Sequence, residues 1–164
     1  MKRFLICAII AAMLTAAAVP ALADVPALNS NMIAYAKGAL SCLAAGDYDR
    51  VVTGLPFSGM SPSADEWRSF ARGAFTDLSG TTPQTQYAVA FWYGRAWRVC
   101  VPVSEPSSDS VEALVLTSED GSTFTGYACV TWDSVRSAYQ SADYVSWDKE
   151  YSTSTSAIVE NDEN

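Results

Sequence analysis

Residues 87–103, YAVAFWYGRAWRVCVPV, most strongly limit what this chain can fold into, because two apolar, aromatic-rich runs flank a single glycine. β-branched and aromatic residues at a period of two are typical of half-buried strands. Gly94 supplies the positive φ of a tight hairpin turn, and Pro102 predicts the end of the second strand. The alternation assigns Tyr87, Val89, Phe91 and Tyr93 to one face of the first arm, and Trp97, Val99 and Val101 to one face of the second, opposite Ala96, Arg98 and Cys100. A lone hairpin is marginal in water, so further strands and a helical cover are expected.

The first 23 residues have the pattern of a signal peptide. A basic start at Lys2 and Arg3 precedes an apolar run over residues 4–19 and a small-x-small cleavage site at residues 21–23. We therefore expect cleavage near Ala23 and a secreted or cell-envelope protein. Residues 24–147 are predicted to form one α+β domain, with an acidic Ser/Thr-rich tail over residues 148–164. This tail is expected to be mobile, the alternative being a further strand over residues 151–159.

Helical patterns come first in the mature chain. The apolar spacing predicts a helix over residues 29–45 that ends at Gly46, and then a short helix over residues 48–54 capped by Asp47. Ser63 and Glu66 form a capping-box pattern, which begins a third helix expected to end at Gly80. Its buried stripe comprises Trp67, Phe70, Ala71, Ala74, Phe75 and Leu78.

Strand patterns follow the hairpin at residues 111–117 and 123–132, separated by the turn sequence of residues 119–122. A last helix is expected from residue 133 or 134 to residue 144. Helices followed by consecutive antiparallel strands predict an α+β fold. In this fold, N-terminal helices pack on one face of a curved four-stranded antiparallel sheet.

Two stretches resemble the NTF2-like superfamily of cone-shaped α+β proteins. Residues 43–52, LAAGDYDRVV, are similar to the helix junction of its secreted bacterial members, and residues 94–99, GRAWRV, to its Gly-x-x-Trp hairpin. The resemblance covers residues 29–132 and implies a curved sheet that encloses a pocket with the helices. The superfamily includes isomerases, dehydratases and cyclases as well as binding modules, so the fold would leave the function open.

The charge of the chain disfavours several partners. Removal of Lys2 and Arg3 with the signal peptide takes the net charge from −8 to −10. Such a surface repels nucleic acid and anionic lipid, whereas a cationic ligand or a basic protein patch remains compatible with it. No later run is apolar and long enough to cross a membrane, so no transmembrane segment is expected in the mature chain.

Three cysteines follow the signal peptide. Cys100 and Cys129 are the candidate disulfide pair, because strand alternation points both to the same side. A simple meander, however, would place another strand between them, and about 9.6 Å at sheet spacing is too far for a disulfide. The alternative is three buried free thiols, including Cys42.

The residues that could carry chemistry are few. The chain has no histidine, which excludes Ser-His-Asp and Cys-His catalysis and imidazole metal sites. No metal site or cofactor is expected, since the cysteines are isolated and no glycine-rich phosphate loop occurs. Glu112, which alternates with Leu114 in a strand, is the candidate catalytic acid, with Arg98 as its conceivable partner. The favoured alternative is that Glu112 lies on an exposed face of the sheet.

The aromatic residues suggest a ligand site. We expect an aromatic-lined cleft between helices and sheet, suited to an apolar or carbohydrate-like ligand, with the alternative that these rings fill the core. The candidate residues are Tyr35, Trp67, Tyr87, Phe91, Trp97 and Tyr127. The favoured function is thus a non-catalytic extracytoplasmic binding module of unknown ligand. A protein–protein interaction module of the cell envelope and a carboxylate-dependent lyase or isomerase are the alternatives.

Overall fold

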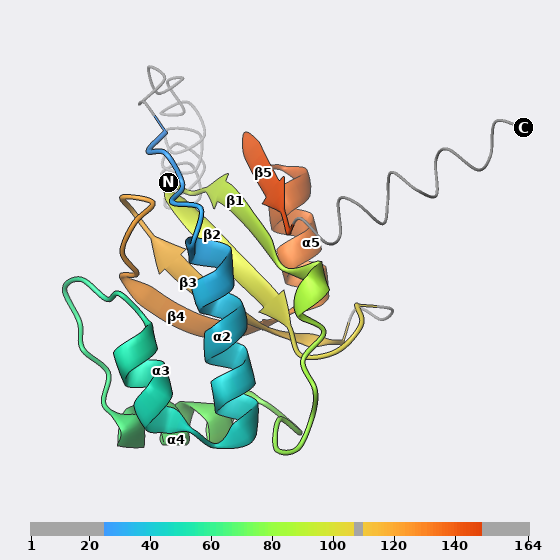
Figure 1. The fold of residues 1–164 in the computed structure, drawn as a ribbon. Helices are drawn as coiled ribbons and strands as arrows, with labels where there is room; N and C mark the ends of the chain where they lie inside the picture. The colour runs from blue at the N-terminus through green and yellow to red at the C-terminus, as the bar shows by residue number, and fades with distance from the viewer. Residues whose placement is uncertain (1–24, 107–109, 149–164) are drawn as a thin grey trace, which may run out of the picture.

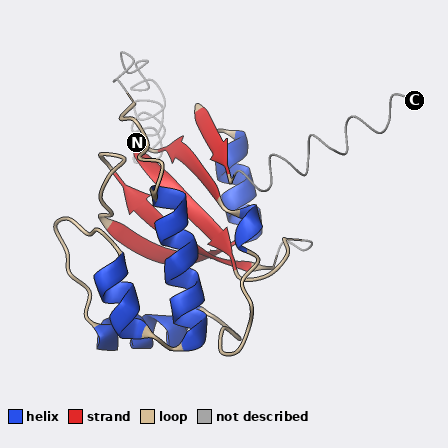
Figure 2. Ribbon diagram, in the orientation of Figure 1, coloured by secondary structure: helices blue, strands red, loops and turns tan. Residues whose placement is uncertain are grey.

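The computed structural model describes residues 25–106 and 110–148 of the 164-residue chain. It has the α+β fold predicted from the sequence, in which helices pack against a curved antiparallel sheet (Figures 1 and 2). The signal-peptide and tail-strand predictions concern residues outside these ranges. No helix in the described ranges is long and apolar enough to cross a membrane.

The elements follow one another in the predicted order, with two additions, a 3₁₀ helix and a fifth strand. The helices are α2 (Met32–Ala45), α3 (Tyr48–Gly54), α4 (Ala64–Ala74), the 3₁₀ helix η1 (Thr85–Tyr87) and α5 (Trp132–Gln140). The strands are β1 (Val89–Tyr93), β2 (Ala96–Pro102), β3 (Glu112–Ser118), β4 (Gly126–Thr131) and β5 (Tyr144–Trp147). Their order across the sheet is β4-β3-β2-β1-β5, so the first four strands form a meander and β5 lies at the β1 edge.

The central hairpin forms as its sequence predicts. β1 pairs with β2 from Val89 opposite Cys100 to Tyr93 opposite Ala96. This register leaves Gly94 and Arg95 as a two-residue loop, with φ of 61° and 66°. Positive φ at both positions is the requirement of a type I′ turn, whose twist matches that of the flanking strands. β2 ends at Pro102, as predicted.

The sheet buries side chains on both faces. Val99, Val101 and Leu116 pack under α2 and α4, whereas Val89 and Val115 belong to a second core under α5. Helices therefore cover both faces of the sheet, whereas the sequence predicted a helical cover on one face. The chain turns directly from β4 into α5, where the Trp132 N–H donates to the Val111 carbonyl at 2.6 Å, and α5 then packs behind the sheet (Figure 1).

Local capping rules fix the helix junctions. Ser63 and Glu66 form the predicted capping box, with the Ser63 N–H donating to Glu66 Oε2 at 2.7 Å and the Glu66 N–H to Ser63 Oγ at 3.3 Å. Gly46 ends α2 in the left-handed region at φ 74°. The Asp47 carboxylate caps α3 by accepting the Arg50 N–H at 3.3 Å. These three junctions confirm the predictions.

Helix α4 ends at Ala74, six residues before the predicted end at Gly80. The Thr76 N–H donates to the Glu112 carboxylate, at 2.9 and 3.1 Å to its two oxygens, and the Thr76 hydroxyl donates to it at 2.6 Å. A charged acceptor on β3 thus draws the backbone away from helical pairing. Phe75 and Leu78 remain buried although they lie outside the helix.

The C-terminal part of the domain differs from the prediction. Helix α5 ends at Gln140 rather than at residue 144, and Tyr144–Trp147 forms β5 beside β1, with Ser146 opposite Ala90. The strand is held at its end by the Lys37–Asp148 ion pair at 3.1 Å and by the Asp148 N–H, which donates to the Ala88 carbonyl at 2.9 Å. Five strands, not four, therefore make the sheet.

The predicted Cys100–Cys129 disulfide is not formed. Cys100 pairs with Val115 in the core under α5, whereas Cys129 pairs with Leu114 in the core under α2 and α4. The two thiols thus lie on opposite faces with β3 between them, and Cys42, Cys100 and Cys129 are free. Burial raises the pKa of the Cys100 thiol far above its ordinary value, and burial with the nearby Glu112 charge raises the pKa of Cys129 to about 11. Both are therefore protonated and unreactive at neutral pH.

A carboxylate in the β3–β4 turn makes the stability of the fold decrease at acid pH. Asp120 accepts the Ser122 and Thr123 N–H groups at 2.7 and 2.8 Å and the Thr123 hydroxyl at 2.8 Å, bonds that hold its pKa well below the ordinary value. A depressed carboxyl pKa stabilises the fold above the unfolded-state pKa of about 3.9, and this contribution is lost as the pH falls through the folded-state pKa.

We expect Asp120→Ala to lower the free energy of unfolding at pH 7. In denaturant titrations this free energy should also decrease less steeply below about pH 4 than in the wild type. Glu119→Ala, which removes an exposed carboxylate from the same turn, is the control, and equal pH profiles for the two variants would contradict the assignment.

Candidate functional site

The six aromatic residues predicted to line a cleft do not meet in one place. Trp67 and Tyr127 lie together between α4 and β4, with ring centroids 4.3 Å apart, and Phe57 and Phe70 surround them. Trp67 is fully buried. These rings fill the core under α4, which is the alternative that the sequence left open.

The other predicted residues are dispersed. Phe91 lies on the opposite face, 6.2 Å from the ring of Tyr139 on α5. Trp97 is buried beside the segment that precedes α2, where its indole Nε1 donates to the Pro26 carbonyl at 2.8 Å. Tyr35 lines a groove of about 170 Å³ between α2 and α3.

Glu112 holds two parts of the fold together. Its carboxylate oxygens accept from Thr76, and Arg98 donates instead to the Thr117 hydroxyl at 2.6 Å. The contacts of Glu112 thus favour a structural role over a catalytic one.

Two other carboxyl groups also lack the property that a general acid in a cleft needs, which is a raised pKa. The pKa values of Glu66 and Asp120 are both lowered, chiefly by backbone hydrogen bonds.

Tyr87, the remaining predicted residue, is part of a different site, which lies on the α5 side of the sheet. It lines a groove of about 250 Å³, called the aromatic groove below. The lining residues are Tyr87, Glu105, Pro106, Trp132, Arg136, Tyr139 and Trp147. Four of these seven carry aromatic rings and two carry opposite charges, the composition that ligand sites use for stacking and orientation.

Several elements position the walls of the aromatic groove. Tyr87 ends η1, and its hydroxyl donates to Glu105 Oε1 at 3.3 Å. Tyr139 comes from α5 and Trp147 from β5, and their rings meet edge to face at 5.2 Å. The pairing of Trp147 with Val89 sets its depth on the sheet. Phe91 packs behind Tyr139, so this predicted site residue supports the groove without lining it.

Sequence reasoning finds Tyr87 and misses the other walls. Neither Tyr139 nor Trp147 is among the residues predicted to line a cleft. The role of Trp147 depends on β5, a four-residue strand too short to give a periodic signal. The signal that could have found it is the spacing of Tyr144, Val145 and Trp147, aromatic and β-branched residues after a helix.

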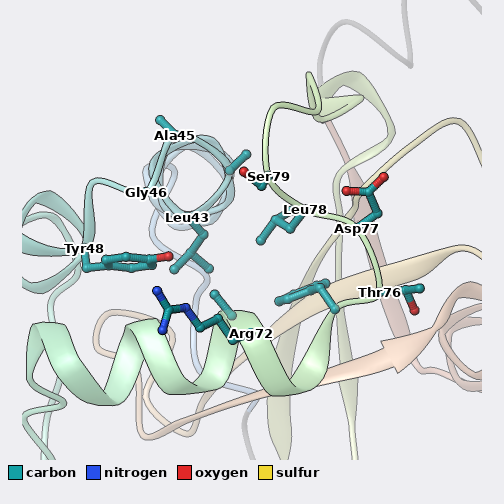
Figure 3. Close-up of a pocket in the computed structure, with 12 residues that line it drawn as sticks. Leu43, Ala45, Gly46, Tyr48, Arg72, Thr76, Asp77, Leu78 and Ser79 are labelled. Carbon is teal, nitrogen blue, oxygen red and sulfur yellow. The ribbon is translucent and has the colours of Figure 1, made fainter.

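A second groove of about 250 Å³ lies at the C-terminal ends of α2 and α4 (Figure 3). Arg72 and the ring of Tyr48 extend toward one another there, whereas the Asp77 carboxylate and Thr76 point away from the centre (Figure 3). Most of the remaining walls are small or aliphatic residues, including Leu43, Ala45 and Leu78. This groove has few aromatic rings and an exposed arginine, so its lining is less typical of a ligand site than that of the aromatic groove.

A third groove, of about 610 Å³, separates α2 from β5. Its apolar walls include Leu28 and Ile33, and the Lys37–Asp148 ion pair joins its two sides. Among the described residues, no cluster of three or more Cys, Asp or Glu side chains could hold a metal ion.

Comparisons of the chain with protein-family models, with curated proteins and with solved structures found no match.

Proposed function

We propose that the protein is an extracytoplasmic, non-catalytic binding module whose ligand lies in the aromatic groove. The observation that carries the proposal is the convergence of Tyr87, Tyr139 and Trp147 from three separate elements beside Glu105 and Arg136. The signal-peptide pattern of residues 1–23 supports export.

The chemistry of the groove favours a ligand with an apolar face and polar edges. The rings of Tyr87 and Trp147 offer surfaces for stacking, while the carboxylate of Glu105 accepts and the guanidinium of Arg136 donates hydrogen bonds. Sugar rings have this combination of C–H faces and hydroxyl edges. A carbohydrate-like ligand, such as a cell-wall fragment, is therefore the proposed class.

Loss of one stacking surface should weaken binding measurably. We expect Trp147→Ala to reduce affinity about tenfold, since an aromatic contact contributes roughly 0.5–1.5 kcal/mol beyond its buried area. The measurement is calorimetric titration with the best ligand from a thermal-shift screen of wall fragments, sugars and amphiphiles.

A matched control separates groove chemistry from general aromatic loss. Tyr93, which is 47% exposed at the far end of β1, lies outside the groove, and Tyr93→Ala should leave affinity unchanged. Equal loss in both variants, or no loss with Trp147→Ala in a folded protein, would exclude the groove as the site.

One observation favours a second function, a protein–protein interaction module of the cell envelope. Tyr93, Tyr144 and Val145 are large exposed residues, 47%, 51% and 42% exposed, at one corner of the sheet where β1 pairs with β5. Exposed apolar residues grouped at a sheet edge are typical of docking surfaces. Crosslinking in the native envelope tests this function: partners captured by the wild type and lost with Tyr144→Ser would support it, and exclusively monomeric protein would not.

A further inference from the structure

The two edges of the sheet differ in how they are covered. Residues 56–58 pair with Phe124 just before β4, where the Phe124 N–H donates to the Pro56 carbonyl at 2.8 Å and the Ser58 N–H donates to the Phe124 carbonyl at 2.9 Å. At the opposite edge β5 pairs with β1, and no described segment pairs with its outer side (Figure 1). The β5 edge is therefore the more open of the two.

The backbone of Val145 points away from β1. In an antiparallel ladder, residues that bond to the neighbouring strand alternate with residues whose backbone groups face the other way. The Asp148 N–H donates to the Ala88 carbonyl at 2.9 Å, so Asp148 bonds to β1. By alternation Ser146 bonds to β1 as well, and Val145 faces outward. No backbone group in the described ranges bonds to Val145 from the outer side, so it presents one donor and one acceptor there.

The side chains at this edge are apolar and exposed. Of the four large hydrophobic residues that are exposed in the described ranges, Tyr144 and Val145 belong to β5, and Tyr93 belongs to β1 at the same corner. Natural edge strands often carry lysine or proline, which hinder pairing with another chain. β5 carries neither residue, so its composition favours the addition of a strand.

The charge of the edge favours a basic partner over a second copy of the chain. Asp143, which directly precedes β5, is exposed and forms no ion pair with any described residue. The whole chain has a net charge of −8, so two copies repel one another, whereas a basic segment is attracted. In an antiparallel partner, the residue two positions after the one opposite Val145 comes beside Asp143. A lysine or arginine there is complementary.

We propose that β5 accepts an extended, basic segment of a partner protein as a sixth, antiparallel strand of the sheet. One residue of the segment exchanges two backbone hydrogen bonds with Val145, and a lysine or arginine two positions later lies beside Asp143. β5 has four residues, so the added ladder is short and an isolated segment binds weakly, with a Kd of about 1 mM. The inference rests on the second proposed function, the protein–protein interaction module, and requires no ligand in the aromatic groove.

The test titrates the synthetic peptide acetyl-Thr-Ile-Thr-Val-Thr-Lys-Thr-amide into the full chain and follows the backbone amides by NMR. Its valine is placed opposite Val145 and its lysine beside Asp143. Saturable shifts are expected at Val145 and its β5 neighbours, and their absence would overturn the proposal. Shifts at β5 that depend on the concentration of the protein alone would mean that a second copy occupies the edge, and would also overturn it.

Removal of one backbone donor separates strand addition from contact between side chains. Methylation of the peptide valine nitrogen, or Val145→Pro in the protein, should each weaken binding about tenfold. Val145→Thr keeps the backbone donor and is the control, with affinity within about twofold of the wild type. The methylated peptide tests the wild-type protein and so does not depend on the folding of Val145→Pro. Equal affinity of the methylated and unmethylated peptides would exclude strand addition.

A charge exchange tests the contact with Asp143. Replacement of the peptide lysine by glutamate should weaken binding about two- to fivefold, and Asp143→Lys should restore it. Asp49→Lys, which makes the same change of net charge at an exposed position on α3, should not restore it. Equal binding of the lysine and glutamate peptides to the wild type would overturn the proposal.

Crosslinking in the native envelope separates this inference from the function on which it rests. Partners lost with Tyr144→Ser but retained with Val145→Pro would support that function and exclude strand addition. Peptide binding as expected, with no partner captured in the envelope, would support strand addition at β5 and exclude the function.

Discussion

Trp67→Ala is expected to destabilise the fold by about 3–5 kcal/mol, the usual cost of removing a fully buried aromatic side chain. Trp67 is 0% exposed, and its ring packs against Phe57, Phe70 and Tyr127 with centroids 4.3 to 6.1 Å away. The neighbours come from α4, β4 and the loop before α4, so a cavity there loosens the contact between helices and sheet. Denaturant unfolding followed by circular dichroism measures the loss.

Trp67→Phe provides the matched control. In the described part of the chain, the buried Trp67 Nε1 has no hydrogen-bond partner, and such a donor costs about 1–3 kcal/mol. Phenylalanine removes this donor and keeps one ring, so we expect less than half of the alanine effect. A Trp67→Phe variant as unstable as Trp67→Ala would contradict this account of the packing around the indole.

Gly121→Ala is expected to cost at least about 2 kcal/mol and to release the segment that precedes α2, residues 25–31, from the sheet. Gly121 has φ 75°, and a Cβ at this position would lie 2.3 Å from the Ala27 carbonyl oxygen. The segment crosses here because the Asn29 N–H donates to the Gly121 carbonyl at 2.8 Å. The substitution therefore adds a clash with backbone to an unfavourable conformation.

Gly59→Ala isolates the contribution of backbone conformation. Gly59 has nearly the same φ, 77°, but nothing lies within 4 Å of the position that a Cβ would take there. We expect this substitution to cost about 1 kcal/mol. Hydrogen exchange of the Asn29 amide should rise in Gly121→Ala and stay unchanged in Gly59→Ala. Similar losses for both variants would mean that residues 25–31 do not pack on this turn.

The sequence predicts those parts of the fold that short-range rules control. The hairpin follows from Gly94 and the alternation beside it, and the start of α4 follows from Ser63 and Glu66. In each case the interacting groups lie within a few residues of one another. Local propensity and tertiary structure agree there, so a pattern is sufficient.

Long-range contacts account for the errors. The end of α4 depends on Glu112, 36 residues away from Thr76, and the fifth strand depends on β1, which lies more than 50 residues before it. The disulfide prediction is wrong because alternation within single strands does not give the register between them. Cys100 faces Val115 while Cys129 faces Leu114, one residue away on the same strand, and one residue reverses the face.

The same effect explains why the candidate site lies elsewhere than predicted. Both arms of the hairpin alternate as predicted, but the two-residue turn sets Phe91 opposite Arg98 and so places it on the other face from Trp97. The six aromatic residues cannot then line one cleft. Of these, Tyr87 alone lines the aromatic groove; it belongs to η1 rather than to β1, and it lies on the α5 side of the sheet, as Val89 and Phe91 do.

The most direct test of the aromatic groove follows the indole N–H signals of the five tryptophans by NMR while wall fragments and oligosaccharides are titrated into the full chain. The account predicts that Trp147 and Trp132, which line the groove, shift with saturation, while Trp67, Trp92 and Trp97 stay in place. Saturable shifts at Trp92 and Trp97 with none at Trp147 would contradict it and would place binding on the α2 side of the sheet.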